Sequence, residues 1–243
     1  MNRTRADFSG LAKERPGWFA PAIAFFVTAC LSAVVFAYYF APGPPGLGEE
    51  LPDPTDATRP VALAVGSMRF RIPANYVQLA SARRGGMLTE VDLAAMLPQL
   101  DGYSLASAKD FTGHAPDSPI VNLKIRSGQA PLPESDRLNR IYQFQIEDPQ
   151  GEPQASGLTR YSFREESGYR GQELFTGMID GQPMVILCER PAADTPAPNC
   201  LRDFPYGNGL GLSYRFKRAH LAQWRDIDTA VRGLVNGFVE RNA

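Results

Sequence analysis

Two cysteines near the C-terminus have the spacing of a structural disulfide. Cys188 and Cys200 bracket a short, proline-containing connection, residues 190–199. A disulfide that closes a loop of this length stabilises a fold by about 3 kcal/mol, and such bonds form in oxidising compartments. The Cys-x-x-Cys spacing of redox proteins is absent, and two cysteines with a distant histidine make no recognisable zinc-ligand pattern. The pair therefore predicts a structural disulfide without a bound metal.

Four arginines form the candidate binding patch of the sequence. Arg69 and Arg71 alternate with apolar residues, so both guanidinium groups should project from one face of a strand, and Arg83 and Arg84 follow in a loop. Guanidinium groups bind carboxylates and phosphates. A solvated sheet face with salt bridges to nearby Asp and Glu is the alternative. We predict that Arg69, Arg71, Arg83 and Arg84 contact an anionic surface of a partner protein.

Residues that could support catalysis are scarce. The chain has two histidines, His114 and His220, and no G-x-S-x-G motif. His114 has Asp110 and Asp117 nearby in sequence, a group that could hold a metal or form a catalytic cluster, although a solvated loop histidine is far commoner. The glycine-rich residues 207–211 precede a predicted strand instead of a helix, which favours a turn over a nucleotide-binding loop. No catalytic residue, metal ligand or cofactor is assigned.

Composition narrows the class of protein. The 243 residues carry 25 Lys and Arg against 26 Asp and Glu, a net charge of −1, and 44% are hydrophobic. This hydrophobic fraction excludes a wholly disordered chain. Because nucleic-acid binding needs a clear cationic excess, the near-neutral balance argues against a nucleic acid as the main partner.

A long apolar segment near the N-terminus predicts a membrane anchor. Residues 18–40 contain no charged side chain, and their length spans a bilayer core of about 30 Å. Trp18 at one end and Tyr38 and Tyr39 at the other have the side chains that favour the headgroup region. We predict a transmembrane helix over residues 17–40 that serves as a signal anchor.

The charges beside this segment set its orientation. Four Lys and Arg residues precede it, and none follows until Arg59. The positive-inside rule therefore places residues 1–16 in the cytoplasm and the C-terminal domain in the periplasm of a bacterium, with the protein in the inner membrane. One alternative remains open, because residues 27–30 resemble a lipobox in which Cys30 would be lipidated. Either form ties the exported domain to the membrane.

A linker separates this segment from the exported domain. Residues 41–60 contain six Pro, three Gly and four acidic residues, a composition that cannot bury a core and favours extended conformations. No second linker of this kind follows. Residues 61–243 are therefore expected to fold as one domain.

The pattern of the domain predicts an α+β fold with an antiparallel sheet. Apolar and polar residues alternate as in half-buried strands, and the Asp180-Gly181 pair is a strong hairpin signal. The predicted strands are residues 68–72, 120–125, 141–146, 158–165, 173–179, 183–189, 199–204 and 210–216. A weak helix is predicted over residues 89–97. A strong amphipathic helix is predicted over residues 220–241, with Trp224 on the side that packs on the sheet.

Together these features favour a function in binding. We expect a membrane-anchored periplasmic protein that acts as a non-enzymatic binding or accessory module of an envelope complex, with another envelope protein as its partner. The alternative is a membrane-anchored periplasmic hydrolase or cell-wall-acting enzyme. The architecture of tail, span, linker and exported domain occurs in many envelope proteins, so it does not by itself specify an activity.

Overall fold

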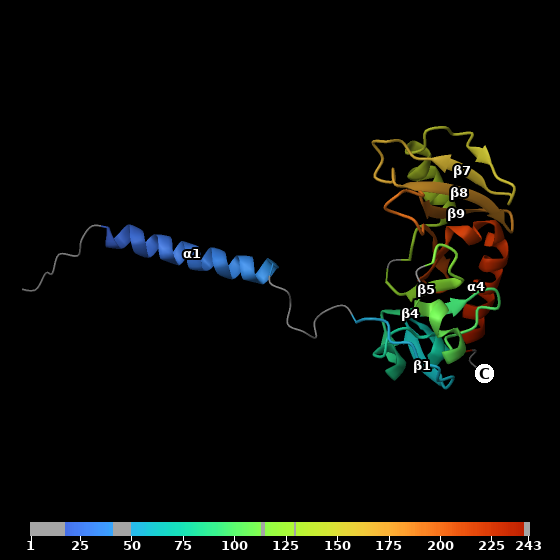
Figure 1. Ribbon diagram of the computed structural model, residues 1–243, viewed down its shortest axis with the longest axis horizontal. Coiled ribbons are helices and arrows are strands. Elements are labelled where there is room, and N and C mark those ends of the chain that lie inside the picture. The colour runs from blue at the N-terminus through green and yellow to red at the C-terminus, as the bar shows by residue number, and fades with distance from the viewer. Residues whose placement is uncertain (1–17, 41–49, 113–114, 129, 241–243) are drawn as a thin grey trace, which may run out of the picture. The chain divides into compact units, whose positions relative to one another are not determined.

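The computed structural model describes residues 18–40, 50–112, 115–128 and 130–240, which fall into two compact units divided after Glu50. The first unit contains helix α1 (Phe19–Phe40), which coincides with the predicted anchor (Figure 1). Among the residues described, no helix combines the length and the apolar character that crossing a membrane requires. The predicted cytoplasmic tail and residues 41–49 of the predicted linker lie outside the described residues.

The second unit begins at Leu51, so the last ten residues of the predicted linker belong to it. The backbone N–H of Asp53 donates to the carbonyl of Gln78 at 2.9 Å, and Ala57 packs against the hydrophobic core. These contacts fix a segment whose composition alone suggests an extended linker.

A small sheet follows this segment. Strands β1 (Pro60–Val65) and β2 (Met68–Pro73) pair antiparallel, and β3 (Gly86–Leu88) pairs parallel to β1, which gives the order β2-β1-β3. Val61, Leu63 and Val65 alternate into the core from β1. Short 3₁₀ turns η1 (Ala74–Tyr76) and η2 (Ala82–Arg84) connect β2 to β3.

The large sheet has eight antiparallel strands in the order β4-β5-β11-β10-β9-β8-β7-β6. Their bounds are β4 Glu90–Met96, β5 Ile120–Arg126, β6 Glu152–Pro153, β7 Thr159–Ser162, β8 Gln172–Ile179, β9 Gln182–Glu189, β10 Asn199–Tyr206 and β11 Leu210–Lys217. In Figure 1, β7, β8 and β9 lie at one end of the unit, and β4 and β1 lie at the other. This arrangement confirms the predicted α+β class with an antiparallel sheet.

The predicted hairpin at Asp180-Gly181 and the predicted turn within residues 207–211 are also confirmed. β8 and β9 are joined by Asp180 and Gly181, whose φ angles of 50° and 75° suit the tight turns that connect twisted strands. β10 and β11 pair from Asn199↔Lys217 to Tyr206↔Leu210. Asn208 and Gly209 between them also have positive φ angles, 48° and 78°, so local turn chemistry shapes both hairpins.

Helix α4 (Trp224–Phe238) covers one face of the large sheet, called here the inner face, and follows a 3₁₀ turn η5 (Arg218–Gln223). Trp224 is 1% exposed, and its indole N–H donates to the carbonyl of Ser156 at 3.1 Å. The predicted amphipathic helix is therefore present, although its α-helical part begins at Trp224. Its buried stripe continues through Ile227, Val231, Val235 and Phe238.

The predicted helix over residues 89–97 is wrong, because this segment is strand β4. It pairs with β5 along its whole length, and Val91, Leu93 and Ala95 point alternately into the core. Pairing with a strand distant in sequence overrides a weak local helical pattern.

The predicted strand over residues 141–146 is also wrong. Helix α3 (Glu134–Arg140) runs into the 3₁₀ turn η4 (Tyr142–Phe144). Tyr142 and Ile146, four residues apart, are buried together, whereas Phe144 is 61% exposed. Helical spacing therefore decides which side chains are buried. Helices α2 (Ala108–Thr112) and η3 (Leu105–Ser107) complete the unit.

Candidate functional site

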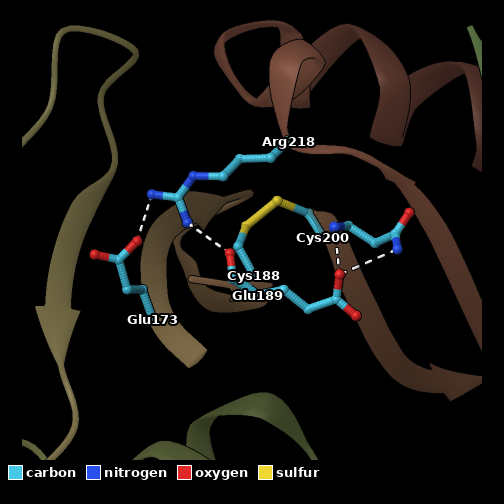
Figure 2. Close-up of a disulfide and its surroundings, with 6 residues drawn as sticks. Glu173, Cys188, Glu189, Cys200 and Arg218 are labelled. Atoms are coloured by element: carbon cyan, nitrogen blue, oxygen red, sulfur yellow. Dashed lines mark hydrogen bonds and ion pairs between the residues drawn. A yellow bond between two sulfur atoms is a disulfide. The ribbon is translucent and has the colours of Figure 1, made fainter. Parts of the chain in front are cut away.

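The predicted disulfide joins two neighbouring strands of the large sheet. Cys188 on β9 and Cys200 on β10 lie directly opposite each other, and both are fully buried (Figure 2). The carboxylate of Glu189 accepts hydrogen bonds from the backbone N–H of Asn199 at 2.7 Å and from its side-chain amide at 3.1 Å. The bond and these contacts hold both ends of the loop formed by residues 190–198 and fix Asn199 at the start of β10.

Arg218 secures this loop from the other side. Its guanidinium donates to the backbone carbonyl of Glu189 at 3.1 Å and forms an ion pair with Glu173 (Figure 2). It also lies over the ring of Phe175, 5.2 Å from the ring centroid. The disulfide and Arg218 therefore have a structural role in holding the sheet and its loop together.

A recess lies on the opposite face of the large sheet, called here the outer face. It has a volume of about 400 Å³ and extends over β4, β5, β11 and the start of β10. A second hollow of about 240 Å³ adjoins it and shares Asn122 and Arg215 with it. The recess is lined by Pro52, Pro54, Asn75, Tyr76, Val77, Gln78, Ala94, Tyr103, Phe111, Thr112, Ser118, Ile120, Asn122, Asn199, Arg215 and Lys217.

Strand register explains why the floor of the recess is polar. Successive side chains of a strand point to opposite faces. In β5, Val121, Leu123 and Ile125 enter the core, so Asn122 faces outward. Asn122 pairs with Arg215 on β11, and Lys217 on the same strand pairs with Asn199. The floor of the recess therefore carries two amide–cation neighbours, Asn122 beside Arg215 and Asn199 beside Lys217.

Two cations of this floor have no carboxylate partner among the described residues. The Arg215 side chain is exposed, and its guanidinium takes part in no ion pair or hydrogen bond there; the Lys217 ammonium donates only to the carbonyl of Ala197 at 3.0 Å. Neighbouring cations of the outer face differ, since the Lys124 ammonium lies 2.9 Å from Glu90 and the Arg126 guanidinium lies 2.9 Å from Asp203.

Aromatic rings and fixed amides form the wall of the recess. Tyr103 and Phe111 contact edge to face with ring centroids 5.3 Å apart. The Gln78 amide donates to the carbonyl of Leu93 and to the side-chain oxygen of Asn122, both at 2.9 Å. These hydrogen bonds hold the side-chain amides of Gln78 and Asn122 in place in the absence of a ligand.

Two polar groups of the wall are poorly solvated. The Asn75 amide donates to the carbonyl of Tyr103 at 3.1 Å, while its side-chain oxygen is buried without a partner. Burial raises the pKa of the Tyr76 hydroxyl, the hydrogen bond with Gly102 opposes this, and the charge of Asp101 adds to it. The Asn75 amide therefore holds the Tyr103 segment in place beside the recess.

A buried network of charges lies at the junction of β9 and β10, called here the seam. Arg202 on β10 is 1% exposed and binds Glu134 through two hydrogen bonds of 2.8 and 3.0 Å. Glu134 also accepts the backbone N–H of Val185 on β9 at 2.8 Å. Arg202 also forms an ion pair with Asp228 of α4, so the network joins α3, both strands and α4.

Asp228, at the other end of the network, also has hydrogen-bond partners. The Tyr214 hydroxyl and the Arg232 guanidinium donate to Asp228 at 3.0 and 2.9 Å. Burial alone lowers the pKa of Arg202, but Glu134, Tyr214 and Asp228 outweigh it and hold that pKa above its usual range. Burial, with the Asp228 charge, raises the pKa of Tyr214. Arg202 therefore stays charged and Tyr214 stays neutral.

The four predicted arginines are in different environments. Arg69 and Arg71 are exposed on β2, as their alternation predicts, and Arg71 lies 3.6 Å from Glu240. Arg84 is also exposed. Arg83 is mostly buried, because its guanidinium pairs with Asp53 and donates to the carbonyl of Val77 at 3.0 Å. The structure therefore gives Arg83 a role in holding the segment that begins at Leu51.

The histidines form no recognisable catalytic group in the part of the chain that the structure describes. His114 lies outside it. The His220 Nε2 atom lies 3.1 Å from the carbonyl oxygens of Asp117 and Ser118. Among the described residues, no group of three or more His, Cys, Asp or Glu side chains could hold a metal ion.

Comparison with known proteins identifies the fold. No family model matches the chain, and no curated protein has a similar sequence. Smlt3025, an immunity protein of the Stenotrophomonas maltophilia type IV secretion system, aligns with a TM-score of 0.55 and 18% identity over 80% of this chain and 98% of that one. The iron-regulated outer membrane lipoprotein FrpD of Neisseria meningitidis aligns with a TM-score of 0.48 and 12% identity, over 78% and 98%. The chain thus shares its fold with the immunity protein.

Sequence reasoning missed both the recess and the seam. Arg215 is brought beside Tyr76 because β11 pairs with β5, β5 pairs with β4, and Val77 bridges Leu93 of β4. A signal for Arg202 is present, because Cys200, Arg202 and Phe204 alternate and therefore face the same side of β10. A cation between two buried side chains needs a buried partner.

Proposed function

We propose that this chain is a non-enzymatic envelope protein that binds a protein partner through the outer face of its large sheet. The observation that carries the proposal is the recess beside Arg215 and Lys217. Its amides are fixed, and two of its cations have no carboxylate partner in the described part of the chain, so the surface is prepared for an external ligand. A protein that shares this fold is described as an immunity protein of a secretion system, which is compatible with a binding role.

We propose that residues 18–40 anchor the protein in the bacterial inner membrane, with the N-terminus in the cytoplasm and the second unit in the periplasm. The support is the uncharged sequence and the basic residues before it. The disulfide is compatible with an oxidising compartment. A C-terminal reporter that works only outside the cytoplasm should be active, and an active cytoplasmic reporter would contradict this topology.

We also propose a second partner contact through Arg69, Arg71 and Arg84. The exposure of these side chains supports it. Arg83 does not suit a test by charge reversal, because its contacts with Asp53 and Val77 would be lost at the same time. Reversal of Arg69 and Arg84 to Glu is the cleaner test, with an unchanged melting temperature and weaker partner recovery as the expected result.

Blocking the recess tests the main proposal. Asn122 is exposed on the floor of the recess, and Asn122→Trp places a bulky ring there. Glu166→Trp introduces the same ring at an exposed position outside the recess. The intact protein is purified from membranes, and the proteins that accompany it are quantified together with its melting temperature.

We expect Asn122→Trp to lower recovery of a specific partner at least tenfold while the melting temperature stays within a few degrees of wild type. Glu166→Trp should retain the partner. Equal recovery with both variants, or loss with both, would contradict a partner site in the recess.

A further inference from the structure

The geometry points to an acidic segment of the partner as the occupant of the recess, with one carboxylate side chain bound by Arg215 and an adjacent apolar side chain packed on the aromatic wall. This inference rests on the proposed function and adds the chemistry of the ligand. It follows from the charges and the rings that line the recess.

Arg215 supplies the principal donor. Its planar guanidinium can donate two parallel hydrogen bonds to a carboxylate, which is the geometry that favours arginine at such sites. Asn122 lies opposite Arg215 in the strand register and is exposed beside it. Lys217, next along the outward side of β11, adds a second positive charge. A single carboxylate bound here is therefore attracted by the charges of Arg215 and Lys217 and oriented by the two parallel donors of the Arg215 guanidinium.

The remaining charges of the outer face favour a carboxylate over a phosphate group. Lys124 is neutralised by Glu90 and lies 3.4 Å from Asp92, and Arg126 is paired with Asp203. These acidic groups would repel a dianion, and the guanidinium of Arg137 is directed at the carbonyl of Asp203. A singly charged carboxylate matches the one or two available cations.

The aromatic wall specifies what lies beside that carboxylate. Tyr103 and Phe111 line the recess from segments outside the sheet, whereas the ring of Tyr76 packs edge to face on Phe238 of α4. Aromatic rings bury large apolar area, and Tyr adds a polar tip. An apolar or aromatic residue next to the acidic residue would cover these rings, so the ligand is a short peptide segment instead of a lone anion.

Two peptide probes test this without the natural partner. One is acetyl-Gly-Phe-Glu-Phe-Gly amide, and the other has Gln in place of Glu. Their affinities for the full-length protein in detergent micelles are measured by ligand-observed NMR, at low and raised salt. The variants are Arg215→Glu, Arg215→Lys and, as a matched control at another exposed position, Arg170→Glu.

We expect the Glu peptide to bind wild-type protein at least tenfold more tightly than the Gln peptide, and raised salt to reduce the difference. Arg215→Glu should abolish the preference, Arg215→Lys should keep part of it, and Arg170→Glu should keep all of it. Equal binding of both peptides, or a preference that survives Arg215→Glu, would overturn the inference.

Competition experiments with inorganic phosphate and with acetate complete the test. If either ion competes with the Glu peptide at the peptide's own concentration, the recess is a small-anion site and the inference fails. Because the probes replace the partner, these results are separate from the recess-blocking experiment. A Glu preference with no partner recovered from membranes would leave the acidic-ligand site standing and contradict the proposed function.

Discussion

The two halves of the large sheet differ in how their outer faces are covered. One row of paired residues crosses both halves, from Ala94, Asn122 and Arg215 through Leu201 and Leu187 to Leu174. In the half formed by β9, β8, β7 and β6, the outer face is buried under Tyr142 and Ile146. In the half formed by β4, β5, β11 and β10, the same face holds the recess.

The comparison distinguishes the packing that stabilises the sheet from the open face that is proposed to bind a partner. Both halves bury their inner face in the main core, so the open half does not depend on its outer face for stability. The halves meet at the seam, where β9 and β10 pair only at Cys188↔Cys200 and Leu187↔Leu201. Arg202 and Glu134 fill the remainder of that junction.

The largest expected effect is at the seam. Arg202→Met removes a buried cation, leaves the buried Glu134 carboxylate without a cationic partner and leaves Asp228 with Arg232 and Tyr214, which should cost about 3 to 5 kcal/mol of unfolding free energy. Arg215→Met, the same change in the open recess, should cost less than about 0.5 kcal/mol. Urea denaturation of both variants measures the difference. Similar losses would show that the seam and the recess are not energetically distinct.

The stability of the half formed by β6 to β9 should depend on outer-face packing more than the stability of the half formed by β4, β5, β10 and β11 does. Leu174 is fully buried on that face, and Leu174→Ala should cost about 3 to 4 kcal/mol. Leu201 belongs to the same row but is only partly buried, so Leu201→Ala should cost clearly less. The two free energies of unfolding test this, and a larger loss at Leu201 would break the comparison.

The disulfide should stabilise the junction between the halves. Replacing Cys188 and Cys200 together by Ala should cost about 3 kcal/mol, because the bond closes a short loop. Cys30→Ala is the control and should leave the melting temperature unchanged, since Cys30 is an exposed free thiol of the first unit. Alkylation of the denatured, unreduced protein should modify Cys30 alone. Three alkylated thiols would contradict the disulfide.

The smallest expected effect is the pH dependence of the free energy of unfolding that Asp92, on the outer face, contributes. Burial raises its pKa, Lys124 opposes this, and Glu90 adds to it. A carboxyl group whose folded-state pKa is raised stabilises the fold at low pH, and this contribution is lost as the pH rises through the folded-state value. Lowering the pH from neutral toward 4 should therefore stabilise wild type relative to Asp92→Asn. A relative loss over that range in denaturation curves would contradict the sign.

Local signals in the sequence were sufficient for the parts of the fold that are set by local chemistry. Asp180 and Gly181 adopt the positive φ angles that their residue types favour, and Cys188 and Cys200 form the expected bond. The alternation around Arg69 also predicted its exposure correctly. These features depend on residues close together in the chain.

The remaining features depend on long-range pairing. Residues 89–97 have a weak helical pattern, yet pairing with β5 makes them a strand. Tyr76 and Arg215 line one recess because β4, β5 and β11 are neighbours in the sheet, an order that no local pattern specifies. Arg202 has the residue type of a surface side chain and is buried only because Glu134 and Asp228 meet it from two helices.

Site-specific photo-crosslinking in intact cells tests the central claim most directly. A photoreactive residue replaces Ser213, which lines the hollow beside the recess, or Glu165, which is exposed outside it. We predict an adduct of one defined mass from position 213, its loss when Arg215→Glu is added, and no such adduct from position 165. The same adduct from position 165 and none from position 213 would contradict the claim that the open half of the outer face binds the partner.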